Sequence, residues 1–128
     1  WELFSAKQPI TSKSLMKTKK ILSDQELEIA INGIILPSFE LIEDKWKTIE
    51  TIDGPIHLVD IKFELGFKVS DNSLVLSDVI DNDSWRIWPG GDPTKQLDKQ
   101  SFREGEDLVN VANKYQLVTQ LTDQFNLS

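Results

Sequence analysis

Three charged residues alternate with apolar ones in the segment Leu58–Gly66, where acids and an amine could act together. Asp60, Lys62 and Glu64 lie at positions i, i+2 and i+4. On a β-strand this spacing puts all three on one face, each about 6.7 Å from the next. An amine held between two carboxylates can organise a site for a metal ion with a phosphate or carboxylate substrate. The alternative is a solvated strand face whose charges pair weakly along the row.

A further carboxylate, Asp78, follows on a segment that is expected to return beside the first. It lies fourteen positions after Glu64, so both acids can share a face if the hairpin loop has an odd length. Two opposed carboxylates repel each other, but a divalent cation between them reverses that penalty. Mg²⁺ typically uses one or two carboxylates together with substrate phosphates. The alternative is that Asp78 ends a strand and starts a turn, because the pattern does not fix the register.

The chain has two arginines, Arg86 and Arg103, and Lys99 lies close to the second of them. The guanidinium group is a planar fork that suits phosphate or carboxylate. These residues are therefore candidates for binding an anionic substrate. The alternative is that each arginine is stacked or simply on the surface, and that Lys99 is solvated.

Two amphipathic helices are expected around these segments. Ser23 followed by Glu26 has the spacing of a capping box, and apolar residues recur at helical intervals over 24–49. Pro37 should kink or divide this helix, because it has no N–H for the hydrogen-bond ladder. A second helical pattern over 105–125 predicts a terminal helix.

Between the helices the pattern predicts a β-hairpin. Residues 57–68 alternate, which indicates a strand with one buried face made of Val59, Ile61, Phe63, Leu65 and Phe67. Turn residues at 70–73 separate it from a returning strand over 74–80, and 81–101 is typical of a loop. The fold class is therefore α+β, an antiparallel hairpin or sheet with flanking helices. Because a lone hairpin is only marginally stable, either residues 1–12 add strands or the hairpin joins a sheet whose other strands are absent.

The composition of the chain argues against several classes of function. The 128 residues carry a net charge of −7, with +4 on residues 1–22 and −11 on the remainder. An acidic body of this kind argues against nucleic-acid binding, which needs a basic footprint. The chain has no cysteine, which excludes a disulfide scaffold and a thiolate zinc site. No apolar run is long enough to span a membrane, and because the chain begins at Trp1 we expect a fragment.

Three blocks, in this order, resemble the SAICAR synthetase family. The first is Leu58–Gly66 (LVDIKFELG), the second is Leu76–Pro89 (LSDVIDNDSWRIWP) and the third is Leu97–Arg103 (LDKQSFR). The second block, with its wording Asn82-Asp83-Ser84-Trp85, is most similar to the bifunctional enzymes that also carry an AIR carboxylase domain. The resemblance is clear over 58–103 and extends to the helices on either side.

The resemblance implies a cytoplasmic, ATP-dependent ligase of de novo purine biosynthesis. Such enzymes use ATP and Mg²⁺ to phosphorylate the carboxylate of CAIR, and the amine of L-aspartate then attacks the acyl phosphate. The products are SAICAR, ADP and phosphate. The implied partners are these small molecules, without nucleic acid or membrane, and the full-length protein is expected to be a homo-oligomer.

The resemblance also implies a role for each candidate residue. Asp60 and Lys62 are the implied catalytic residues lining the imidazole ribonucleotide site, Glu64 and Asp78 the acids that hold magnesium and ATP, and Arg86, Arg103 and Lys99 the substrate-binding residues. Residues 1–128 then correspond to the C-terminal lobe of an ATP-grasp-like fold. The N-terminal ATP-binding lobe and the AIR carboxylase domain are expected to be absent. The alternative is an inactive nucleotide-binding or interaction domain that keeps the fold.

Overall fold

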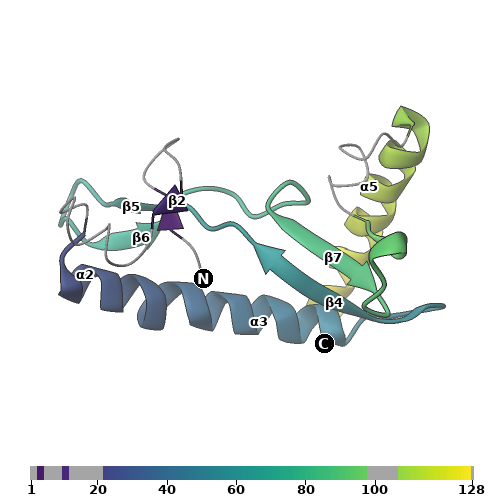
Figure 1. Cartoon of the computed structure of the whole chain (residues 1–128), viewed down its shortest axis with the longest axis horizontal. Helices are drawn as coiled ribbons and strands as arrows, with labels where there is room; N and C mark the ends of the chain where they lie inside the picture. The colour runs from purple at the N-terminus through teal and green to yellow at the C-terminus, as the bar shows by residue number, and fades with distance from the viewer. Residues whose placement is uncertain (1–2, 5–9, 12–21, 98–106, 128) are drawn as a thin grey trace.

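The computed structural model describes residues 3–4, 10–11, 22–97 and 107–127 and has the α+β fold expected from the sequence. In chain order its elements are β1 (Leu3–Phe4), β2 (Ile10–Thr11), α2 (Asp24–Glu28), η1 (Ile29–Ile35), α3 (Leu36–Lys47), β3 (Glu50–Thr51), β4 (Gly54–Ile61), β5 (Leu65–Phe67), β6 (Leu74–Leu76), β7 (Trp85–Pro89), η2 (Pro93–Lys95), α5 (Leu108–Asp123) and η3 (Gln124–Leu127). One long helical rod, made of α2, η1 and α3, runs along one side of strands β4–β7, and α5 stands at the β7 end (Figure 1).

The helical rod begins at the capping box that the sequence predicts. The backbone N–H of Glu26 donates to Ser23 Oγ at 3.1 Å, and the backbone N–H of Ser23 donates to Glu26 Oε1 at 3.0 Å. At Pro37 the structure shows a change of hydrogen-bond pattern, from π-helical in η1 to α-helical in α3, and the rod continues. Pro37 lies in the first turn of α3, where a missing N–H costs α3 no internal hydrogen bond.

The antiparallel sheet β3–β4–β7 contains a β-bulge that sets which residues face the core. Leu58 pairs with Ile87, but the next pair joins Asp60 to Arg86, so Val59 is an extra residue in β4. An extra residue reverses the alternation of faces. Ahead of the bulge Leu58 is therefore the buried residue, and the prediction that Val59 begins the buried face is wrong.

The structure also corrects the strand boundaries. The predicted strand 57–68 is two strands, because β4 ends before three non-strand residues and β5 follows them. The returning strand predicted over 74–80 is only β6. The segment 81–101, predicted as a loop, contains β7, whose partner β4 is remote in sequence. A five-residue strand between an Asp/Asn turn and Pro-Gly has little local signal, so only the long-range pairing defines it.

The core lies where the end of α3 meets β4, β7 and α5. Trp46 is completely buried, and its ring meets Trp85 and Phe125 edge to face at centroid distances of 5.3 and 4.8 Å. Ile56 and Ile87, from the inner face of the sheet, are also fully buried. Aromatic pairs in this geometry stabilise a core beyond their buried area. Trp46 therefore joins the long helix, the sheet and the C-terminal segment into one unit.

We expect Trp46→Ala to lower the free energy of unfolding by about 3–5 kcal/mol, the usual cost of truncating a large buried aromatic side chain. The matched control is Leu41→Ala on the same helix, because Leu41 is 64% exposed and its loss should change stability by less than about 0.5 kcal/mol. Urea unfolding followed by circular dichroism measures both. Equal stability losses for the two variants would contradict this picture of the core.

Candidate functional site

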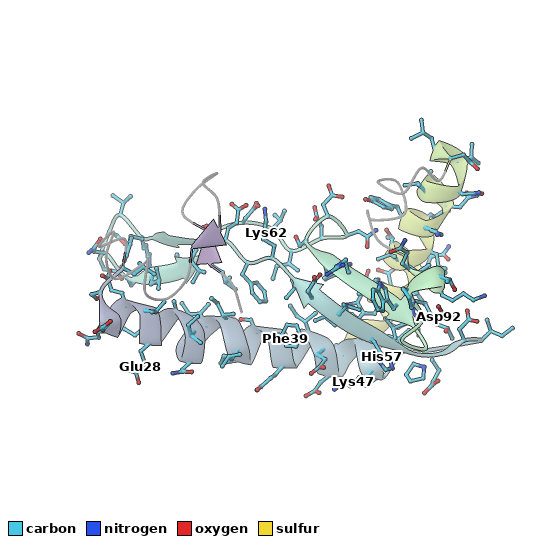
Figure 2. The ribbon with its side chains drawn as sticks, viewed as in Figure 1. Glu28, Phe39, Lys47, His57, Lys62 and Asp92 are labelled. Atoms are coloured by element: carbon cyan, nitrogen blue, oxygen red, sulfur yellow. The ribbon has the colours of Figure 1, made fainter. Side chains whose placement is uncertain are left out.

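Lys62 lies in the connection between β4 and β5, just beyond the end of the sheet (Figure 2). Its backbone N–H donates to the carbonyl of Ser84 at 2.7 Å, which extends the β4–β7 pairing by one residue. Its ammonium donates to Glu64 Oε1 at 2.6 Å. Both side chains are about half exposed, so the pair faces solvent. The lysine is thus anchored by its backbone and presents its charge to the outside.

Three carboxylates raise the pKa of Lys62. The hydrogen bond to Glu64 is the largest influence raising the pKa of the ammonium, and the negative charges of Glu64, Asp78 and Asp81 raise it further. Lys62 therefore stays protonated at neutral pH. A permanently charged ammonium can stabilise negative charge on a phosphate, but it cannot accept a proton as a general base.

Glu64 and Asp78 both lie near Lys62, but the hairpin register is not what unites them. The β5–β6 loop has an even length, and the backbone N–H of Ser77 donates to the carbonyl of Glu64 at 3.0 Å. Ser77 therefore stands opposite Glu64, and Asp78 does not. The expectation that Glu64 and Asp78 share a face required a loop with an odd number of residues, so that expectation is wrong. Asp78 lies beyond the end of β6, and its Oδ1 accepts from the backbone N–H of Val79 at 2.9 Å. The two acids have in common that each interacts electrostatically with the ammonium of Lys62.

Asp60 lies two positions from Lys62, but it forms its ion pair with Arg86 across the β4–β7 ladder and not with Lys62. The Nε–H of Arg86 donates to both carboxylate oxygens of Asp60, at 3.0 and 2.9 Å, and Nη2 also donates to Oδ2. Both side chains are partly exposed. The expected Asp60–Lys62–Glu64 row is therefore divided into two ion pairs, Asp60–Arg86 and Lys62–Glu64.

The loop between β6 and β7 brings in residues that the sequence did not single out as site residues. The amide of Asn82 accepts from Trp85 Nε1 at 2.9 Å and donates to the carbonyl of Leu97 at 3.1 Å. Asp83 accepts from the hydroxyl of Tyr115, on α5, at 2.8 Å. Asp81 is the additional acid near Lys62. The Asp-Asn-Asp-Ser composition indicates a turn, but these contacts join segments that are distant in sequence.

A pocket of about 600 Å³ lies behind this loop. Its walls come from α3, β7, α5, η3 and the loop, and most of their area is apolar, although the loop adds Asp81, Asn82 and Asp83. Among the described residues that line the pocket, none is a lysine or an arginine. A phosphate group therefore suits the Lys62 edge better than this pocket.

Two of the candidate residues, Lys99 and Arg103, lie outside the residues that the structure describes. Within the described part, no group of three or more acidic, histidine or cysteine side chains is arranged to hold a metal ion alone. A metal at this edge would need further ligands in addition to Glu64 and Asp78. Substrate phosphates supply such ligands in many Mg²⁺ sites. In the same part of the chain no helix is both long and apolar enough to cross a membrane.

The fold and the charged edge together define a class. An exposed edge of an α+β domain that carries a lysine, an arginine and several carboxylates can bind an anionic small molecule together with a cation. Comparison with known families makes this specific. The SAICAR synthetase family model matches residues 7–122, and the chain belongs to that family.

Curated relatives agree with this assignment. The phosphoribosylaminoimidazole-succinocarboxamide synthase of Herpetosiphon aurantiacus is 44% identical over 92 residues, covering 68% of this chain and 35% of the relative. The corresponding synthase of Chloroflexus aggregans is 40% identical over 116 residues, covering 77% of this chain and 44% of the relative. The human bifunctional phosphoribosylaminoimidazole carboxylase/succinocarboxamide synthetase is 48% identical over 71 residues, covering 56% of this chain and 16% of the relative. The chain thus spans less than half the length of each.

Solved structures show the same fold. The synthase from Ehrlichia chaffeensis superposes with a TM-score of 0.75 at 28% identity, covering 92% of this chain and 47% of the solved one. A SAICAR synthetase in complex with ADP superposes with a TM-score of 0.71 at 26% identity, covering 91% and 45%. Both alignments cover more than nine tenths of this chain, and its described helices and strands follow the family fold.

The charge environment of Lys62 generates a direct test. We expect its pKa to lie above the ordinary lysine value, and Glu64→Gln to lower it toward that value, because the amide removes both the anionic acceptor and its charge. Titration followed by NMR of the Lys62 side chain measures this shift. Glu43→Gln, in an exposed ion pair on α3, is the control and should leave Lys62 unchanged. A wild-type pKa at or below the ordinary value would contradict the structure.

Proposed function

We propose that this chain supplies part of the active site of an ATP-dependent ligase that joins L-aspartate to CAIR in de novo purine biosynthesis. The products are SAICAR, ADP and phosphate. The observation that carries the proposal is the Lys62–Glu64 pair with Asp78 and Asp81 around it, inside the block that resembles the family. Family membership and the names of the curated relatives support the reaction class.

Lys62 is proposed to bind phosphate oxygens. Its raised pKa keeps it cationic, so it offsets charge on a phosphate without exchanging a proton. That role suits a reaction in which a carboxylate is activated by phosphoryl transfer and then attacked by an amine. In such a reaction, binding and electrostatic stabilisation provide most of the rate enhancement.

Glu64 and Asp78 are proposed to hold Mg²⁺ together with the nucleotide. Both are exposed carboxylates near one ammonium, and hard oxygen donors are what Mg²⁺ requires. Two carboxylates plus phosphate oxygens make a conventional ligand set, so the residues present fit the ion. When bound, the ion would offset phosphate charge, and Lys62 would add to that effect from the protein side. The ADP complex of a related synthetase supports nucleotide binding.

The substrate side is proposed to include Arg86, Arg103 and Lys99. Arg86 is on the exposed face of β7 beside the Lys62 edge, and its guanidinium can bind a phosphate or carboxylate. Arg103 and Lys99 are proposed from their places in the third sequence block. All three side chains are cationic, which suits anionic substrates in a chain whose net charge is −7.

The remaining part of the site is proposed to come from outside this chain. The chain spans 35–44% of its bacterial relatives, and we propose that it corresponds to the C-terminal lobe, with an N-terminal ATP-binding lobe and any AIR carboxylase domain beyond it. We also propose a homo-oligomeric, cytoplasmic enzyme without nucleic-acid or membrane partners.

Glu64→Ala and Asp78→Ala, each made in the complete enzyme, should reduce kcat by roughly 10²–10³-fold, the usual loss on removing one electrostatic stabiliser. Folding should be unaffected, because both side chains are exposed. ADP release with CAIR, aspartate and MgATP measures turnover. Asp44→Ala, an exposed acid on α3, is the matched control and should retain full activity.

Full activity in both site variants would contradict the proposal. Mg²⁺-dependent ADP binding without any turnover in the wild-type enzyme would instead favour an inactive nucleotide-binding domain.

A further inference from the structure

Asp60 and Arg86 form the most extensively hydrogen-bonded ion pair among the described residues. Arg86 Nε–H donates to Oδ1 at 3.0 Å and to Oδ2 at 2.9 Å, while Nη2 donates to Oδ2. The carboxylate therefore lies along the Nε–Nη2 edge of the guanidinium plane and fixes the orientation of that plane. The other described ion pairs each rest on one charged contact.

The β-bulge creates this pair. If β4 and β7 continued in the register that joins Leu58 to Ile87, Val59 would stand opposite Arg86. The extra residue moves Asp60 into that place. A bulge re-aims the side chains that follow it and is a common device beside functional sites. The backbone irregularity thus gives Arg86 a carboxylate partner in place of an aliphatic side chain.

The pair stands on the same face as the Lys62 edge. Asp60 pairs with Arg86, and two residues further along the ladder the backbone N–H of Lys62 donates to the carbonyl of Ser84. Side chains two positions apart on a strand share a face. Arg86 and Lys62 therefore present two positive charges on one side of the sheet. In the proposed function these charges bind anionic groups of the substrates.

We infer that Asp60 is a positioning residue that holds the Arg86 guanidinium for a phosphate group of the ribonucleotide substrate. This inference rests on the proposed function, and it gives Asp60 an indirect role where the family resemblance implies a catalytic one. An ionised carboxylate only accepts hydrogen bonds, so Asp60 would repel a phosphate that it touched directly. A long arginine side chain fixed before binding loses less conformational freedom when the anion arrives.

The sign of the effect separates positioning from simple electrostatics. Asp60→Asn removes a negative charge beside Arg86, and charge alone would make phosphate bind more tightly. Loss of positioning has the opposite effect. We expect Asp60→Asn to weaken phosphate binding about two- to fivefold, in the range expected for an exposed ion pair.

The experiment titrates inorganic phosphate into the protein and follows the Nε–Hε NMR signal of Arg86. Wild type and Glu43→Gln, which loses an equivalent charge from α3, should bind equally. Asp60→Asn should bind more weakly, and Asp60→Glu, which keeps the carboxylate, should recover most of the affinity. In turnover assays Asp60→Asn should raise KM for the ribonucleotide while kcat stays within about twofold, because the contact is made in both the ground and transition states.

Unchanged or tighter phosphate binding by Asp60→Asn would overturn the inference, and so would failure of Asp60→Glu to recover affinity. Circular dichroism measures whether each variant is folded. If Asp60→Asn does not fold, the affinity of Asp60→Glu still tests the inference. The two proposals fail differently. A wild-type enzyme without ligase turnover, but with phosphate binding that depends on Asp60, would reject the ligase and keep the positioning role. Normal turnover with KM unchanged in Asp60→Asn would reject only the positioning role.

Discussion

The antiparallel pairing of β4 with β7 organises both the core and the charged edge of this domain. Its inner face supplies Ile56 and Ile87 to the core around Trp46, and its outer face carries the Asp60–Arg86 pair. The same ladder, extended by one backbone hydrogen bond, anchors Lys62. The core and the charged site are thus built on opposite sides of one pair of strands.

A single extra residue reconciles these two requirements. Strict alternation along β4 could not bury Leu58 and also turn Asp60 toward Arg86 in the observed register. The bulge at Val59 shifts the alternation once, so that Leu58 before it and Ile61 after it both face the core while Asp60 is exposed. Beyond Ile61 the chain leaves the sheet, and the short β5–β6 hairpin follows as a separate pair of strands.

Electrostatics impose a second constraint. The chain is strongly acidic, yet its proposed substrates are anions, so the few cations at the site must remain charged and correctly placed. Lys62 is cationic at neutral pH, the nearby carboxylates raise its pKa further, and the hydrogen bond to Glu64 orients its ammonium. Excess negative charge at such an edge would repel phosphate, unless a divalent cation offsets it. The several acids beside Lys62 therefore support the proposal that the site includes a divalent cation.

The fold class, the capping box at Ser23, the two flanking helices and the family resemblance could be predicted from the residues alone, because they depend on local periodicity and on ordered blocks of residues. The spacing also predicted that Lys62 and Glu64 are neighbours. The bulge at Val59, the existence of β7, the Asp60–Arg86 pair and the approach of Asp81 to Lys62 could be found only in the folded protein. These features arise from register and from contacts between distant segments. A pattern read along one strand contains no information about which residue of another strand will stand opposite it.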